Sequence, residues 1–194
     1  MTRGLPLVVL ALSPLVIVIA VGLMLFVVRT GGEHEPTPGL TAEATLASPH
    51  GETVGTVRFR QTASGVLVIA DMKGLPPGGH AFVIHEVGAC TPDFAAAGDH
   101  FNPTDAEHGF VHAAWKRGGS GEAHSGDLPN IYAASDGSAR ADFFTVGITL
   151  DEGPRHSILD TDGSAIIVHE RPDTYGESEP DTGARLACGV IERT

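Results

Sequence analysis

The sequence predicts an all-β fold, an antiparallel barrel or sandwich, preceded by one N-terminal transmembrane helix. Short runs that alternate apolar and polar residues follow one another from residue 42 onward, separated by clusters of turn-forming residues. The 25 glycines and 13 prolines disfavour long helices, while a hydrophobic content of 42% is too high for a disordered chain. The one predicted helix is an uncharged apolar segment near the N-terminus.

That segment covers residues 4–28. As a helix it would span roughly 37 Å, enough for the hydrocarbon core of a bilayer. A cleaved signal peptide is the alternative, because Ala20, Val21 and Gly22 resemble a small-x-small cleavage site. The apolar run continues through Phe26, however, which favours an uncleaved anchor.

The chain therefore divides into three parts. Residues 1–29 are a membrane anchor or signal segment, residues 30–40 are a polar linker, and residues 41–194 form a β domain. We expect a single-pass protein of the cell membrane with the domain on the extracytoplasmic side. Cleavage of the segment would instead make the protein secreted.

The clearest strands form a hairpin. Thr53–Gln61 and Val66–Asp71 are the two strands, and Thr62–Gly65 has the composition of a hairpin loop. The other strand candidates are Ala81–Glu86, Ala139–Val146, Ala165–His169 and Ala187–Ile191.

Two long irregular segments connect these strands. The first lies between Cys90 and Asn130, has little strand signal and holds four of the ten histidines. The second runs from Arg171 to Ala184. Structureless loops of this length are unusual in a compact domain, so we expect them to be functional.

The first loop has the ligands of a zinc site. Three histidines and a carboxylate, His100, His108, His124 and Asp127, follow the pattern H-x7-H-x15-H-x2-D, which suits a tetrahedral zinc ion. His85 and His169 each end a predicted strand and suggest a second, nitrogen-rich site for copper or zinc. The alternative is that these histidines are scattered over the surface or hydrogen-bonded individually.

The charge of the chain excludes one class of partner. The formal net charge is −12, and a nucleic-acid-binding protein needs a basic stripe that this sequence lacks. The sequence shows no motif that would predict an oligomeric state.

Several short motifs, in this order, resemble the copper/zinc superoxide dismutase family across residues 42–191. They are GLPPGGH at 74–80, VIHE at 83–86, AGDHFNP at 97–103, HG at 108–109, HSGDLPN at 124–130, IVHE at 167–170 and ARLACGVI at 184–191. The resemblance implies a Greek-key antiparallel barrel or sandwich with long metal-binding loops, and superoxide as the substrate.

The resemblance also implies residue roles. His100 would bridge copper and zinc, with His108, His124 and Asp127 completing the zinc set and His85 and His169 on the copper side. Cys90 and Cys188 would form a disulfide, Arg185 would guide the superoxide anion, and Asp173 would connect the two metal sites behind their ligands. His80 would be a buried structural histidine. Three histidines match no motif and are expected in solvent: His34, His50 and His156.

One copper ligand of the family pattern is missing. The pattern at the first copper strand is His-x-His, and this chain has Val83 at the first of the two positions. Positions 83 and 85 share a strand face, so a histidine at 83 would have joined His85 at the metal. We expect zinc to bind, copper to bind weakly and dismutase activity to be weak or absent. His112 is the one candidate for a replacement ligand.

The alternative is a working superoxide dismutase that converts superoxide to oxygen and hydrogen peroxide and protects the cell envelope. Against it stands the second loop, which contains Glu177, Glu179 and Asp181 and would repel an anion. Lys116 and Arg117 in the first loop are the residues that could attract the anion instead.

Overall fold

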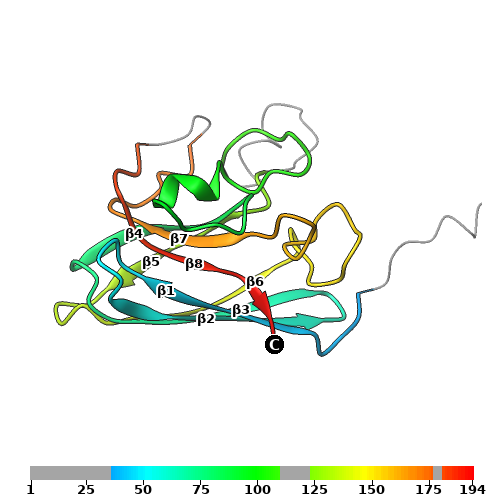
Figure 1. Cartoon of the computed structure of the whole chain (residues 1–194), viewed down its shortest axis with the longest axis horizontal. Helices are drawn as coiled ribbons and strands as arrows, with labels where there is room; N and C mark the ends of the chain where they lie inside the picture. Colours follow the sequence, from blue (N-terminus) through cyan, green and yellow to red (C-terminus); the bar gives the residue numbers. More distant parts are fainter. Residues whose placement is uncertain (1–35, 110–122, 177–180) are drawn as a thin grey trace, which may run out of the picture. The chain divides into compact units, whose positions relative to one another are not determined.

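The structure, a computed structural model, describes residues 36–109, 123–176 and 181–194. Nine strands lie in these residues and form one antiparallel sheet (Figure 1). The strands are β1 (Thr41–Ala47), β2 (Thr53–Thr62), β3 (Gly65–Met72), β4 (Gly78–His85), β5 (Asp127–Ala133), β6 (Ala139–Thr145), β7 (Ala165–His169), β8 (Arg185–Val190) and β9 (Glu192–Arg193).

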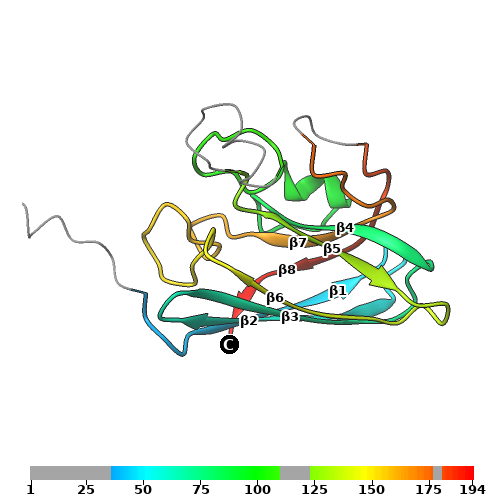
Figure 2. The same cartoon turned by 180° about the vertical axis from the view of Figure 1, so that it is seen from behind.

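The strand order is β5-β4-β7-β8-β1-β2-β3-β6, with β9 paired to β1. β5 and β6 are consecutive in sequence yet occupy the two ends of this order, where they pack against each other. The sheet therefore curls into a nearly closed Greek-key barrel. Two layers are visible from either side, one containing β4, β7 and β8 and the other β1, β2 and β3 (Figures 1 and 2).

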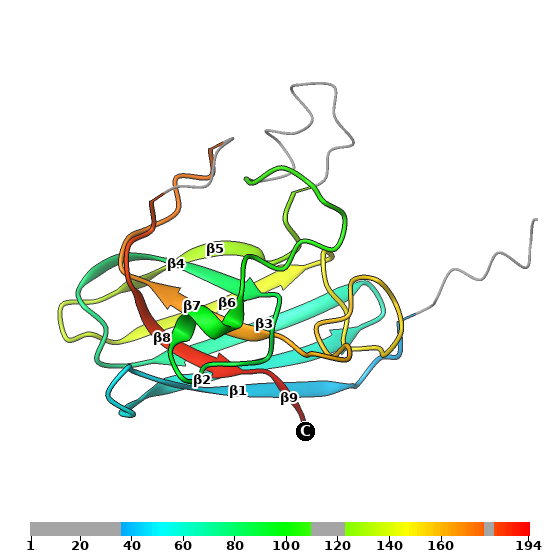
Figure 3. The same cartoon turned by 45° about the horizontal axis from the view of Figure 1, so that its top comes forward.

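The core between the layers follows from the alternation in the sequence. In β2, Val57 and Phe59 are buried while Arg58 and Arg60 are exposed. β7 is buried at every position because both of its faces are covered. Ile166 and Val168 face the main core, whereas Ala165 and Ile167 pack with Cys188 under the short 3₁₀ helix η1 (Phe94–Ala97) (Figure 3).

The six strand candidates are confirmed, with ends that differ by up to three residues. β1, β5 and β9 were not among the candidates. β5 begins at Asp127, so the first long loop ends earlier than expected. Pro129 weakens the strand signal of β5 in the sequence. Proline is tolerated there because β5 is an edge strand of the ladder.

No helix within residues 36–109, 123–176 and 181–194 is long and apolar enough to cross a bilayer. The predicted anchor lies in residues 1–35, outside the described part of the chain.

The predicted disulfide between Cys90 and Cys188 is confirmed. It joins the start of the first long loop to the middle of β8 across 98 positions of sequence. The loop segment that carries η1 is thereby attached covalently to the barrel.

Replacing both cysteines by alanine should lower the free energy of unfolding by about 4–5 kcal/mol, because the bond closes a long loop and restricts the unfolded chain. Urea denaturation of the double variant and of the wild type would measure this. Reduction of the wild type should give a similar loss, and equal stability with and without the bond would contradict the argument.

Candidate metal centre

The predicted ligands come together outside the barrel, against the layer that contains β4 and β7. The described parts of the first long loop and of the segment after β7 lie on this same side of the sheet in all three views (Figures 1–3). His85 and His169 are the last residues of β4 and β7, two strands that pair directly.

Alternation along β4 decides which side chains face the loops. Phe82 and Ile84 belong to the main core, so Val83 and His85 point to the opposite face. Val83 is paired across the sheet with Asp127 on one side and Ile167 on the other. Position 83 is therefore on the same face of β4 as His85, as the alternation of strand residues predicts.

His100 is placed beside His85 by a short extension of the sheet. His85 and His100 form an antiparallel bridge, in which Glu86 N donates to Asp99 O at 3.0 Å and Phe101 N donates to Ile84 O at 2.9 Å. The rings of His85 and His100 lie 5.1 Å apart between centroids.

His124 and Asp127 reach the same place through Gly126. A Cβ atom at position 126 would lie 2.2 Å from the carbonyl oxygen of Ile84, so only glycine allows this approach to β4. Gly126 N donates to Phe101 O at 2.9 Å and Ile84 N donates to Gly126 O at 3.0 Å. The close contact thus attaches the end of the first loop to the strand that carries His85.

The four residues of the predicted zinc set form one cluster, with one ligand atom of each within 4.8 Å of the others. The Asp127 carboxylate is its centre. Its oxygens lie 2.8 Å from His100 Nδ1, 3.1 Å from His108 Nδ1 and 3.5 Å from His124 Nδ1. Burial would raise the pKa of Asp127, but these imidazoles outweigh burial and hold its pKa far below the usual range.

Two nitrogens of this cluster have no hydrogen-bond partner although they are buried: His108 Nδ1 and His124 Nδ1. The other nitrogen of each ring is occupied, since His108 Nε2 lies 3.0 Å from Asp173 Oδ2 and His124 Nε2 lies 3.1 Å from the carbonyl oxygen of Ala106. When a cation replaces the proton on Nδ1, each Nε2 can donate to its oxygen and each Nδ1 can present a lone pair to the cation. Unpaired buried nitrogens are costly, and a zinc ion would satisfy them.

The copper-side residues form a second cluster that shares His100 with the first: His85, His100 and His169. His85 Nε2 and His169 Nε2 lie 3.3 Å apart. Burial is the main cause of a lowered pKa at both residues, to about 3 for His85 and about 4 for His169, and the neighbouring charge of Arg185 adds to it. Both imidazoles are therefore neutral and can act as metal ligands.

Arg185 lies beside this second cluster. Its guanidinium donates to the carbonyl oxygens of Phe94 and Gly98, and His85 Nδ1 lies 3.0 Å from the same Gly98 oxygen. Gly98 ends η1 with a positive φ of 73°, a conformation that favours glycine. The turn after η1 therefore presents one carbonyl to both side chains.

Asp173 lies on the zinc side. Its two carboxylate oxygens lie 3.2 and 3.0 Å from His108 Nε2, and Oδ1 also accepts from Tyr175 N. Burial alone would lower the pKa of His108, but the carboxylates of Asp127 and Asp173 outweigh burial and raise it to about 10. Asp173 therefore contacts the predicted zinc set through His108.

Three residues that support the site were not singled out from the sequence. Thr182 Oγ1 lies 2.9 Å from His169 Nδ1 and orients that ring. Asn130 exchanges two hydrogen bonds of 2.8 Å with the backbone of Asp173, and Asn130 N donates to the Tyr175 hydroxyl. Asn130 ends the HSGDLPN motif, which was a usable signal, whereas nothing in the sequence distinguished Thr182 or Tyr175.

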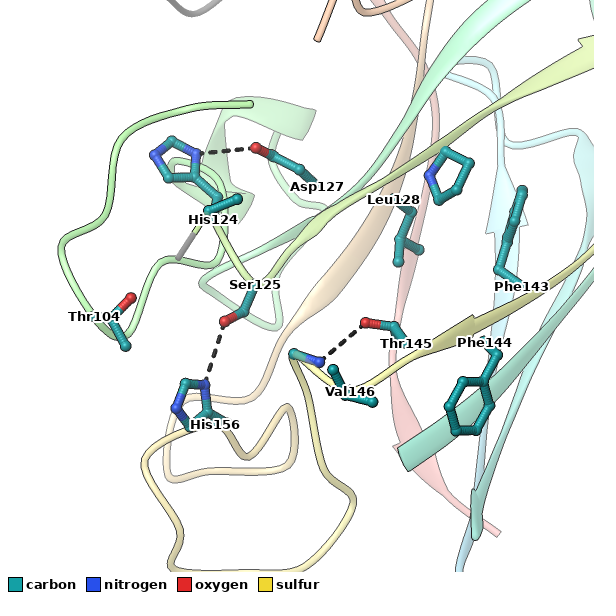
Figure 4. A pocket seen from close by; sticks show the side chains of 13 residues that line it. Thr104, His124, Ser125, Asp127, Leu128, Phe143, Phe144, Thr145, Val146 and His156 are labelled. Atoms are coloured by element: carbon teal, nitrogen blue, oxygen red, sulfur yellow. Dashed lines mark hydrogen bonds and ion pairs between the residues drawn. The ribbon is translucent and has the colours of Figure 1, made fainter. Parts of the chain in front are cut away.

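Among the remaining histidines, His80 is buried as expected, with its ring nitrogens 2.8 Å from His169 O and 2.7 Å from Pro76 O. His50 is exposed as expected. The expectation for His156 is wrong, because it is half-buried and its Nδ1 lies 3.3 Å from Ser125 Oγ. Figure 4 shows this contact among the residues that line a cavity of about 380 Å³; the same lining includes His124, whose ring is turned toward Asp127.

Of the acidic residues Glu177, Glu179 and Asp181 of the second loop, only Asp181 lies in the described part of the chain. Asp181 forms an ion pair with Arg171, the first residue of the second loop. The pairing reduces the repulsion that Asp181 would exert on an anion. Several other residues of the sequence argument lie outside the described part of the chain: His34, His112, Lys116, Arg117, Glu177 and Glu179.

Comparison with known proteins points to one family. The profile of the family described as copper/zinc superoxide dismutase (SODC) matches residues 53–191. The chain is 40% identical over 158 residues to a copper/zinc superoxide dismutase of Caulobacter vibrioides, covering 78% of this chain and 86% of the relative. It is 39% identical over 156 residues to copper/zinc superoxide dismutase 2 of Aquifex aeolicus, with the same two shares.

A solved structure agrees. The crystal structure of a superoxide dismutase-like protein from Bacillus subtilis superposes with a TM-score of 0.67 at 34% sequence identity. The similarity covers 76% of this chain and 96% of that one.

The histidine pKa values predict how the metal-free protein responds to pH. His85 and His169 have folded pKa values below the ordinary 6.5, so the unfolded chain binds more protons and stability is lost as the pH falls from 6.5 toward 4. His108 has the opposite shift, so its contribution is lost as the pH rises from 6.5 toward 10. Stability should therefore be greatest near neutral pH.

Urea denaturation of the metal-stripped full chain across this range would measure the two limbs, each buried histidine contributing a slope of up to about 1.4 kcal/mol per pH unit. His85→Gln should flatten the acid limb, whereas the same change at the exposed His50 should not. A stability that does not change between pH 4 and 10 would contradict the shifts.

Proposed function

This chain belongs to the copper/zinc superoxide dismutase family, and we propose that it is a membrane-anchored, extracytoplasmic member that binds zinc and dismutates superoxide slowly or not at all. The observation that carries the proposal is the contrast between the two histidine clusters. The zinc cluster has all four ligands of the family pattern, and the copper cluster has Val83 in place of one.

Zinc binding is supported by the two buried nitrogens without partners. His108 Nδ1 and His124 Nδ1 face the Asp127 carboxylate without hydrogen-bond geometry, which is the arrangement that a shared cation would stabilise. Asp173 and the carbonyl of Ala106 hold the outer nitrogens of the same rings. The cluster connects the first loop to β5, so metal binding would add to the stability of the folded domain.

The copper side is the weaker half. When bound, copper supplies the one-electron chemistry of superoxide dismutation. This chain offers His85, His100 and His169, while the side chain at position 83 has no donor atom. Tetragonal copper(II) is suited to four nitrogen or oxygen donors, so three imidazoles hold it less firmly.

The second candidate function is a working superoxide dismutase, and specific contacts favour it. Arg185 lies next to His85 through the shared Gly98 carbonyl, where its positive charge would attract superoxide. Arg171 neutralises part of the acidic rim at Asp181. Under this alternative the protein would protect the cell envelope from superoxide.

The location is part of the proposal. The uncharged residues 4–28 would hold the protein in the cell membrane by a single pass, with the metal-binding domain outside the cytoplasm. The disulfide is consistent with such an oxidising compartment. Cleavage after the apolar segment would release the same domain as a secreted protein.

Removing zinc should lower the thermal midpoint of the full chain. A ligand that binds only the folded state stabilises it by about 2.7 kcal/mol when its free concentration is 100 times the dissociation constant. Calorimetry of the zinc-loaded and the chelated protein would measure the difference.

His108→Ala should reproduce the chelated behaviour and become insensitive to added zinc, while His50→Ala should behave as the wild type. An unchanged midpoint after complete removal of zinc would refute zinc binding at this cluster.

Val83→His should increase the dismutase rate of the copper-loaded protein by about 10- to 100-fold. Loss of a residue that supports a metal ligand typically costs this factor in metal affinity or activity, and a direct ligand should contribute at least as much. Steady-state or pulse-radiolysis measurement of superoxide decay would test this. Val83→Ala is the matched control, because it removes the same side chain without adding a donor.

Equal rates in the wild type and Val83→His would favour the working enzyme and indicate a replacement ligand, with His112 the first residue to mutate. Neutralising Glu177, Glu179 and Asp181 in the Val83→His background should raise the rate further, and the gain should shrink as salt is added.

A further inference from the structure

We propose that the cluster of His85, His100 and His169 is a site for the cuprous ion, Cu(I), and that it holds Cu(I) in preference to both Cu(II) and a second Zn²⁺. The inference rests on the proposed function in one respect: it takes the neighbouring cluster to be filled by zinc. It goes beyond that function because it assigns an oxidation state to the incomplete copper site.

The first step is that the donors are already turned toward one another. His85 Nδ1 lies 3.0 Å from the carbonyl oxygen of Gly98, an acceptor, so this nitrogen carries the proton and Nε2 has the lone pair. His169 Nδ1 lies 2.9 Å from Thr182 Oγ1, which can accept in the same way. The two Nε2 atoms are 3.3 Å apart, so either one donates to the other or, when Thr182 accepts from His169 Nδ1, both lone pairs face the same point and a cation there would bind both.

The position of the fourth donor in the family pattern is occupied by an apolar side chain. Val83 occupies the position of the missing donor on the face that carries His85, and only 1% of its surface is exposed. Its cross-strand neighbour Ile167 is completely buried. The other cross-strand neighbour, Asp127, has its carboxylate engaged with His100, His108 and His124. Val83 and Ile167 thus offer no polar atom on this side, and a water molecule would find few free partners there.

The third step compares what each ion needs. Zinc is almost always four-coordinate and tetrahedral in protein sites, and Cu(II) prefers a tetragonal set of nitrogen and oxygen donors. Both would need a fourth ligand on the side that Val83 closes. Cu(I) is stable with three imidazole nitrogens, so it loses least from the substitution.

The surroundings of the cluster also favour an ion of lower charge. His85 and His169 are buried, and the free energy of transferring an ion from water into such a site grows with the square of its charge. The guanidinium of Arg185 lies against the same Gly98 carbonyl as His85 and adds a positive field. Both effects disfavour a divalent ion more than a monovalent one.

The test is a set of titrations on the full chain loaded with one equivalent of zinc. Cu(I) is added without oxygen in competition with bathocuproine disulfonate, Cu(II) in competition with a chromophoric chelator, and further Zn²⁺ separately. The wild type should bind one Cu(I) and should bind Cu(II) and a second Zn²⁺ more weakly. Val83→His should raise the Cu(II) affinity by about 100-fold, because a ligand contributes at least as much as the outer partners whose loss costs about 10–100-fold. The Cu(I) affinity should change by much less.

Two further variants locate the ion. His169→Ala should abolish Cu(I) binding while the first zinc is retained, which also shows that the variant is folded. The exposed His50→Ala should bind both ions as the wild type does. Tighter binding of Cu(II) or of a second Zn²⁺ than of Cu(I) would overturn the proposal, as would Cu(I) binding that survives His169→Ala. A chain that takes up no zinc at all would refute the proposed function instead, and the Cu(I) titration would still decide the second site.

Discussion

The buried carboxylate of Asp127 is the contact on which the metal centre depends. Its two oxygens face the Nδ1 atoms of His100, His108 and His124, which arrive from three separate points of the first long loop. These contacts join three points of the loop to one carboxylate, and a metal ion bound there would add to the stability of the folded domain. The same residue begins β5 and pairs with Val83, so one side chain relates the zinc ligands to the barrel.

His100 makes the two clusters interdependent. It is fixed to the end of β4 by the bridge with His85, and its Nδ1 faces Asp127 in the zinc cluster. The other two histidines of the zinc set, His108 and His124, are held by Asp127, Asp173 and the carbonyl of Ala106. None of these three residues belongs to the copper-side cluster. Val83 takes part in none of these side-chain contacts, so an apolar residue at this position of β4 is compatible with the complete four-residue cluster.

Arg185 and the disulfide both connect β8 to the first long loop. Arg185 is on β8, yet its guanidinium reaches the carbonyls of Phe94 and Gly98 on the first loop. The disulfide from Cys90 to Cys188 joins the same loop to the same strand. Two independent connections therefore hold the turn at Gly98 that orients His85. In the second loop, the ion pair with Arg171 neutralises part of the negative charge of Asp181.

The sequence by itself determined the class of fold and the chemistry of the ligands. Alternation in β2 and β3 is a local property, and the order of the histidine motifs predicted which residues cluster and which position departs from the family pattern. Only the tertiary structure decided how these parts meet. β5 was missed because Pro129 hides an edge strand, the role of Thr182 beside His169 has no sequence signal, and the contact of His156 with Ser125 joins two distant loops. The order of the strands, with β5 and β6 meeting at the two ends of the sheet, is likewise a property that no window of residues contains.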